Sequence, residues 1–393
     1  MKTLINFISS LMKEWAFVLV VSCIALYNAR LFGMNAFHII PIPFVLYYFI
    51  NFSKHQSFQK DYIILFILLM IQTFFFTIAS EGGDVFGNMK VYILSLLVMT
   101  YKPNLKVADN LLTILAISGL VLGFYTLQHP EYIGDFRLTV RIGDVVQDPT
   151  WITVLLLPSF CVGLCWLGMD SILQKMLGML VMLFCVYIVF LSGSRGTLLA
   201  MLVAVVTWIT YSRSKKNRLK IIFSLFFLIL IGYFAFVAIW GVLDEELLSR
   251  YTEDDTSGHI RLYTWSLIIN GIFEGNILQL FLGHGLGSCI RDFRLDAHNM
   301  LLQQIYEMGV FGLIVMLTFL YKITQRVYAS KNTCCKCLIN ALIFVALLTP
   351  IWGHIYYFTL LSSILYIVNS EKENNKINYL SEHEYSNYVY LYR

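Results

Sequence analysis

"LQKMLGMLVMLFCVYIVFLS", residues 173–192, is an apolar run as long as a helix that crosses a membrane. Similar runs recur along the 393 residues of the chain, of which 58% are hydrophobic and 13% charged. Soluble domains have about 45–50% apolar and about 25% charged residues. A β-barrel would have segments of alternating polarity, whereas these runs are continuous. The sequence therefore predicts an all-α polytopic membrane protein.

The apolar runs predict about twelve transmembrane helices, with bounds defined to within a few residues. When the N-terminus is placed in the cytoplasm, most of the 28 lysines and arginines fall on the cytoplasmic side, as the positive-inside rule requires. We therefore expect a single transmembrane domain over residues 1–369, with an uncleaved first helix, and a cytoplasmic tail over 370–393. The expected spans are 14–29, 36–51, 62–79, 88–101, 109–127, 149–168, 173–192, 196–211, 219–243, 298–320, 338–352 and 354–369.

Two of the expected connections on the outer side are long. One covers residues 128–148, and the larger covers 244–297, between spans nine and ten. Loops of this length inside a compact domain are usually functional or disordered. Residues 261–276 have the apolar spacing of a helix, so we expect the larger loop to form a small cap with one or two amphipathic helices.

The basic residues on the outer side are nearly all arginines, although topology alone does not require arginine. The planar guanidinium group binds phosphate through two parallel hydrogen bonds. The outer face is therefore predicted to bind an anionic group. The alternative is that each arginine pairs with an Asp or Glu of its own loop. The outer arginines are Arg30, Arg137, Arg141, Arg195, Arg250, Arg261, Arg291 and Arg294.

Three of these arginines occupy informative positions. Arg195 lies in the sequence SGSRG between two apolar runs, where a charge without a partner is unfavourable. The alternative is a topological anchor that extends to the membrane surface. Arg137 and Arg141 lie in the loop that enters the sixth span. Asp148 and Pro149 in that loop fit a helix N-cap followed by proline at the first helical position, but the arginines have no such local explanation.

"GHGLGSCIRDFRLDAHNMLLQQIYEMGVFG", residues 283–312, joins a glycine-rich loop to a membrane span. The glycines permit a tight turn that can bring backbone close to a ligand. His298 and Asn299 lie where the tenth span is expected to begin, and Glu307 lies about two turns into it. An ionisable residue at that depth is a functional candidate, with a structural pair to a neighbouring arginine as the alternative. In an ideal helix His298 and Glu307 face opposite sides.

The sequence predicts neither a metal site nor a cofactor. Among eight cysteines, Cys334, Cys335 and Cys337 are close together but lack a second group of ligands at zinc spacing. The acidic residues 253–255 also lack regular ligand spacing, and a solvated turn explains them better.

These stretches together resemble one family. SGSRG at the start of a helix, a large outer loop with spaced arginines and a tryptophan, and LGHGLGS followed by HNMLLQQIYEMGVFG resemble the O-antigen ligase and O-antigen polymerase superfamily. Its members are glycosyltransferases of the bacterial inner membrane with the C-type architecture. The resemblance covers roughly residues 137–320, and its most specific part is the His-Asn and Glu-x-x-Gly-x-x-Gly pattern at 298–312.

The resemblance implies a reaction and its site residues. A glycan on undecaprenyl diphosphate is the donor on the periplasmic face, an acceptor hydroxyl attacks the anomeric carbon, and lipid diphosphate leaves. It implies contact with membrane lipid and a chain-length regulator protein as a partner, and no nucleic acid. Motif matches assign catalysis to Arg195, Arg261 and His298. Substrate binding is expected at Arg137, Arg141, Arg250, Asn299 and Glu307.

The chemistry of these residue types agrees with that reaction. Arginines in a water-poor site stabilise the charge that develops on a diphosphate leaving group. Histidine, with an unperturbed pKa near 6.5, suits the role of general base toward the acceptor hydroxyl. A polymerase joining repeat units is the expected activity, and a ligase transferring the glycan to the lipid A core is the alternative. A lipid-linked oligosaccharide flippase is less favoured, because the chain has no internal repeat and its unusual charges lie in outer loops.

Overall fold

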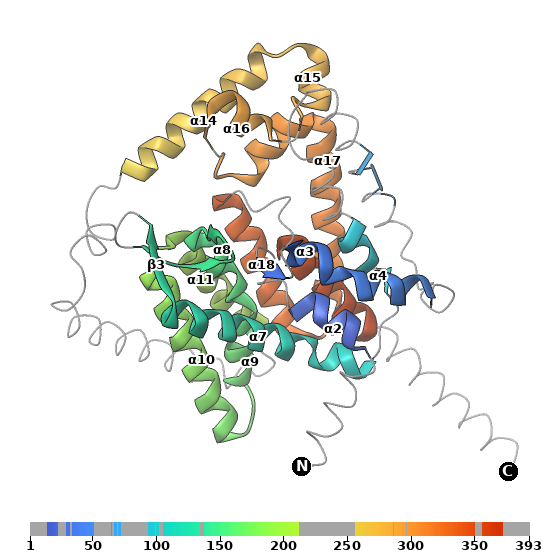
Figure 1. Cartoon of the computed structure of the whole chain (residues 1–393), viewed down its shortest axis with the longest axis vertical. Helices are drawn as coiled ribbons and strands as arrows, with labels where there is room; N and C mark the ends of the chain where they lie inside the picture. Colours follow the sequence, from blue (N-terminus) through green and yellow to red (C-terminus); the bar gives the residue numbers. More distant parts are fainter. Residues whose placement is uncertain are drawn as a thin grey trace, which may run out of the picture.

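The computed structural model describes a largely helical chain (Figure 1). The described residues are 14–22, 29–31, 34–50, 64, 67–68, 70–71, 93–98, 100–101, 105–133, 137–211, 256–285, 287–295, 297–349 and 356–371. The predicted span 219–243, most of the predicted span 62–79, residues 88–92 and 99 of the predicted span 88–101, and Arg250 lie outside these residues.

Among the described residues, four stretches of helix are long and apolar enough to cross a membrane, and each overlaps a predicted span. They confirm the prediction of a helical polytopic membrane protein, while the total of twelve spans stays a prediction. The first lies in α7 (Leu105–Gln128) and the second runs through α8 (Pro149–Leu155) and α9 (Leu157–Trp166). The others are α10 (Ile172–Leu191) and α17 (Met300–Ala329).

Shorter helices complete the bundle. They are α2 (Trp15–Ser22), α3 (Ala36–Ile39), α4 (Pro41–Ile50), α11 (Arg195–Tyr211) and α18 (Thr333–Leu348). A last helical stretch covers residues 356–371. The apolar helices α4, α11 and α18 fall within or close to the predicted spans 36–51, 196–211 and 338–352.

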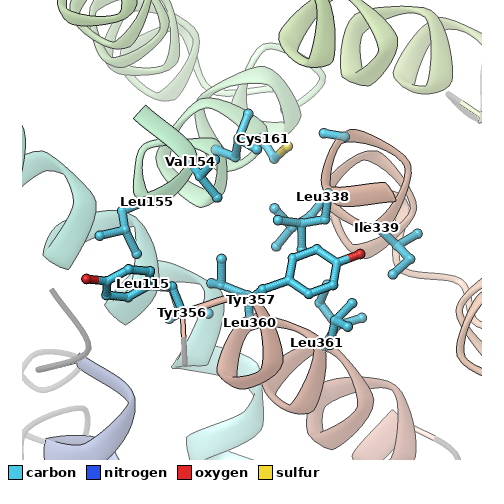
Figure 2. Packing of buried hydrophobic residues seen from close by; sticks show 14 of the residues in the cluster. Leu115, Val154, Leu155, Cys161, Leu338, Ile339, Tyr356, Tyr357, Leu360 and Leu361 are labelled. Atoms are coloured by element: carbon cyan, nitrogen blue, oxygen red, sulfur yellow. The ribbon is translucent and has the colours of Figure 1, made fainter. Parts of the chain in front are cut away.

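The core of the bundle lies where these helices cross. Figure 2 shows Tyr357 of the last helix among buried side chains of α9 and α18, including Cys161 and Leu338. Small residues allow α9 and α10 to approach closely, since a Cβ atom at Gly163 would lie 2.9 Å from the carbonyl oxygen of Gly178. Such small-residue contacts are typical of helix packing in membranes.

The structure contains short strands that the all-α prediction missed. The loop predicted at 128–148 folds into an antiparallel sheet of β3 (Pro130–Ile133), β4 (Arg137–Ile142) and β5 (Val145–Val146). A second, smaller pair joins β1 (Arg30–Leu31) to β2 (Met34–Asn35). The stretch RLTVRI in β4 is rich in β-branched residues, which favour strands where no long apolar run imposes a helix.

The described part of the predicted outer loop 244–297 is helical. It forms α14 (Thr256–Glu274), α15 (Ile277–Leu282) and α16 (Ser288–Phe293), which gather around the start of α17 at one end of the molecule (Figure 1). The connection between α17 and α18 is short and the two helices pack together, so they run antiparallel. The end of α18 therefore points toward the end of the bundle from which α17 begins.

Candidate active site

The arginine of the SGSRG sequence begins a helix. α10 ends at Leu191, and the chain turns at Gly193, where φ is +60° and glycine is favoured. Arg195 is then the first residue of α11, with a half-buried side chain. The first N–H groups of a helix lack partners within the helix and carry partial positive charge, so they add to the attraction that Arg195 has for an anion.

A buried group of hydroxyls fixes this turn. Thr153 Oγ1 of α8 lies 2.8 Å from Thr197 Oγ1 and 3.2 Å from Ser194 Oγ, and these last two oxygens lie 3.0 Å apart. All three side chains are buried. The start of α11 is therefore held against α8 by polar contacts, which favour one position for Arg195.

The sheet brings Arg137 to the same turn. Its Nε atom donates a hydrogen bond of 3.2 Å to the carbonyl oxygen of Ser192, although 55 residues separate the two. Asp148 caps α8, its carboxylate accepting from Thr150 N at 2.7 Å, as the sequence predicts. β4 thus brings the Arg137 side chain to the turn that precedes Arg195.

Arg141 has a different environment from Arg137. Its Nε atom donates to Glu131 Oε1 at 2.9 Å, and the two side chains are 50% and 37% exposed. This contact supports the alternative that an outer arginine pairs within its own loop. An exposed pair of this kind contributes about 0–1 kcal/mol to stability.

His298 lies just before α17, not inside it. The prediction started the span at 298, but Asn299 is the N-cap of a helix that begins at Met300. The Asn299 side chain accepts from the N–H groups of Leu301 and Leu302 at 2.9 and 3.2 Å. The ideal-helix relation between His298 and Glu307 is therefore wrong, because His298 has φ +47° and no helical position.

α14 lies beside His298. Trp265 Nε1 donates a hydrogen bond of 2.8 Å to the carbonyl oxygen of Ala297. Arg261 is half-buried and lies one helical turn before Trp265, on the same face of α14. The cap therefore brings the predicted Arg261 and His298 into one assembly. It has a small core of its own, made of Ile268, Cys289, Ala297 and Tyr306.

Glu307 lies beside a break in α17. Gly309 has φ +67° and ψ −174°, which no helix contains. The Glu307 side chain is 3% exposed, and Gln303 Nε2 lies 3.4 Å from its Oε1 atom. The carbonyl oxygen of Glu307 accepts from Gly285 N at 2.9 Å, so the loop containing Gly285 pairs with the backbone of the broken helix. The glycine turn predicted to approach a ligand thus approaches α17.

The sequence analysis missed the residues that hold this loop in place. The His284 ring stacks on Tyr306 with centroids 4.2 Å apart and an angle of 8°. Tyr306 donates its hydroxyl to Asp292 at 2.8 Å, and Arg291 Nε pairs with Asp292 at 2.7 Å. The hydrogen bond from Arg291 lowers the pKa of the Asp292 carboxyl. The rings of His284 and Tyr306 are 22 residues apart in the sequence. This spacing has structural meaning only in the fold, where α17 is broken.

The turn before Arg195 and the segment that carries His298 lie toward the same end of the bundle. A Cβ atom at Gly196, the residue after Arg195, would lie 3.5 Å from Leu348 Cβ at the end of α18. Since α18 is antiparallel to α17, its end points toward the side on which His298 lies. Among the described residues, no group of three His, Cys, Asp or Glu side chains could hold a metal ion.

Residues 180–317 match the family model described as O-antigen ligase. The match includes Arg195, Arg261 and His298, and it confirms the predicted resemblance to the O-antigen ligase and polymerase superfamily. No curated protein matches the chain. A chain of the solved structure titled "Structural coordination of polymerization and crosslinking by a peptidoglycan synthase complex" is similar at 16% identity and a TM-score of 0.46, with 80% of this chain and 98% of that chain covered.

Proposed function

We propose that the protein is a glycosyltransferase that joins glycan repeat units carried on undecaprenyl diphosphate, with lipid diphosphate as the leaving group. The observation that carries this proposal is that Arg137 contacts the turn that precedes Arg195. This turn lies at the end of the bundle toward which His298 lies. The family match to O-antigen ligase supports transfer of a surface glycan. The site would face the periplasm from the bacterial inner membrane, with both chain ends in the cytoplasm.

In this proposal the arginines bind the donor diphosphate. Arg195 extends from the start of α11, where the helix dipole adds positive potential. Arg137 contributes a second guanidinium beside the turn through its contact with Ser192, and Arg261 is contributed by the cap. As the bond between the anomeric carbon and the diphosphate oxygen breaks, negative charge grows on the leaving group. Fixed guanidinium groups stabilise that charge more in the transition state than in the bound donor.

His298 would act on the acceptor. A neutral imidazole accepts the proton of the acceptor hydroxyl while the hydroxyl oxygen forms its bond to the anomeric carbon. Lipid diphosphate leaves with the electron pair of the broken bond and needs little protonation. The cap that holds His298 also holds Arg261, so a single rigid unit would align acceptor and donor.

Two acceptors fit this chemistry. A second lipid-linked repeat unit makes the protein a polymerase, and the lipid A core makes it a ligase; the family match is compatible with both. A deletion strain distinguishes them on a lipopolysaccharide gel. A core carrying a single repeat unit supports the polymerase, and bare core with polymer retained on undecaprenyl diphosphate supports the ligase. An unchanged ladder would refute both and bring back transport of lipid-linked oligosaccharide.

Arg195→Ala is expected to reduce transfer by about 10²–10³-fold, as the loss of one preorganised donor to a developing anion does. Arg195→Lys should recover only part of this loss, because an ammonium group lacks the paired geometry of guanidinium. The measurement is the rate of glycan transfer by purified protein in nanodiscs. Arg326→Lys is the matched control, since Arg326 lies near the end of α17 and contacts Asn369. Equal rates for both lysine variants would remove the diphosphate role of Arg195.

Transfer is also expected to continue in the presence of EDTA. The positive charge that neutralises diphosphate comes from arginines in this proposal, so a divalent cation is not required. The measurement compares initial rates with and without chelator on the same protein sample. A loss of rate that added magnesium or manganese restores would contradict the proposal that arginines alone bind the diphosphate.

A further inference from the structure

Arg261 lies on the face of α14 that packs against the core of the cap. Arg261, Trp265, Ile268 and Ile272 follow one another at intervals of four, three and four residues, which places them on one side of a helix. Ile268 is fully buried in the small core that contains Ala297, and Ile272 packs against that core. Arg261 therefore lies at the end of the face by which α14 contacts the segment that precedes α17.

Trp265 makes a polar contact from this face to the backbone beside His298. Its indole N–H lies 2.8 Å from the carbonyl oxygen of Ala297, which is 1% exposed. A buried carbonyl left without a donor is unfavourable, so this hydrogen bond constrains the position of the chain at Ala297. The next residue along the chain is His298.

His298 has a backbone conformation that requires such support. Its φ of +47° lies in the left-handed region, which only a few per cent of residues other than glycine occupy, histidine more often than most. Such conformations persist where surrounding structure holds them and are concentrated at functional sites. The support here comes from both sides, since Trp265 binds the preceding carbonyl and Asn299 caps the helix that follows.

We propose that Trp265 is a positioning residue that aligns His298 with Arg261 in the transfer reaction. Its indole N–H fixes the backbone at Ala297, and its own helix carries Arg261 one turn away, so one side chain sets the relation between the two groups. The role in transfer rests on the proposed function. The effect of Trp265 on the backbone conformation of His298 does not.

Trp265→Phe is the direct test, because it keeps an aromatic ring and removes the N–H donor. We expect kcat to fall about 10- to 100-fold, as the displacement of a reacting group does, and the KM for the donor to change by less than about twofold. In a His298→Ala background the same substitution should cause no further fall, because residues that act through one group are not additive. If the double variant loses kcat by the full product of the two single effects, Trp265 does not act through His298. That result would overturn the positioning role and indicate a general defect.

Amide hydrogen exchange provides a measurement that does not depend on activity. In Trp265→Phe, exchange should increase over residues 297–302 and stay unchanged over α18. Trp166→Phe is the matched control, since it makes the same chemical change at a half-buried tryptophan of α9 and should leave both exchange at 297–302 and kcat unchanged. Unchanged exchange at 297–302 in Trp265→Phe would overturn the proposal. If the wild-type protein transfers no glycan while exchange increases as expected, the proposed function fails and the backbone contact stands.

Discussion

His298→Ala should lower the rate of glycan transfer by about 10²–10⁴-fold, the usual contribution of a general base. The acceptor hydroxyl would then have to lose its proton to water, while the arginines would still bind and stabilise the donor diphosphate. The loss should therefore appear in kcat, with the KM for the donor little changed. The measurement is a time course of product formation from a lipid-linked donor. The donor is at a saturating concentration and in excess over the protein.

His129→Ala is the matched control for this experiment. His129 follows the end of α7, and its exposed ring lies 4.6 Å from that of Tyr125. Its removal should leave transfer within about twofold of wild type, since exposed changes away from special features have small effects. If His298→Ala keeps the wild-type kcat at every donor concentration, His298 is not the base and the proposed reaction needs another proton acceptor.

Local sequence patterns predict the helices of this protein well. The apolar run at 173–192 becomes α10 almost residue for residue, because hydrophobic length and the need to satisfy backbone polar groups in lipid leave few alternatives. The break of α17 at Gly309 has no such local cause. It depends on the pairing of Glu307 with Gly285, which lies more than twenty residues earlier in the chain. Hydrophobicity alone predicts one uninterrupted helix in the region of α17.

The environments of the arginines also depend on contacts between residues that are distant in the sequence. Arg137 and Arg141 are four residues apart in one predicted loop, so sequence alone assigns them similar chemistry. The register of the sheet separates them. Arg137 pairs with Ile133 at the start of β4 and reaches Ser192, whereas Arg141 contacts Glu131 on the exposed side. Which arginine binds an anion depends on contacts that only the folded chain forms.

Gly309→Ala should destabilise the protein by about 3 kcal/mol or more, because it combines backbone strain with a steric conflict. The φ and ψ of +67° and −174° are accessible essentially to glycine alone, which accounts for about 1–3 kcal/mol. In addition, an added Cβ would lie 2.4 Å from the carbonyl carbon and oxygen of Phe281, so α15 would have to move away from α17. Overpacking of this kind adds about 1–3 kcal/mol. Thermal unfolding of detergent-purified protein measures the sum.

Gly287→Ala is the control, at a glycine of positive φ where an added Cβ meets no steric conflict. Gly287 also has a positive φ, of +80°, but an added Cβ would meet no atom within 4 Å. Its replacement should therefore show only the backbone cost, of roughly 1 kcal/mol, with transfer activity retained. Alanine at Gly309 adds a steric conflict to a backbone conformation that is essentially limited to glycine, so the unfolding temperature of the Gly309 variant should fall well below that of the Gly287 variant. Equal unfolding temperatures would mean that the loop and α17 do not pack as closely as 2.4 Å implies, and the break that places Glu307 would lose its structural basis.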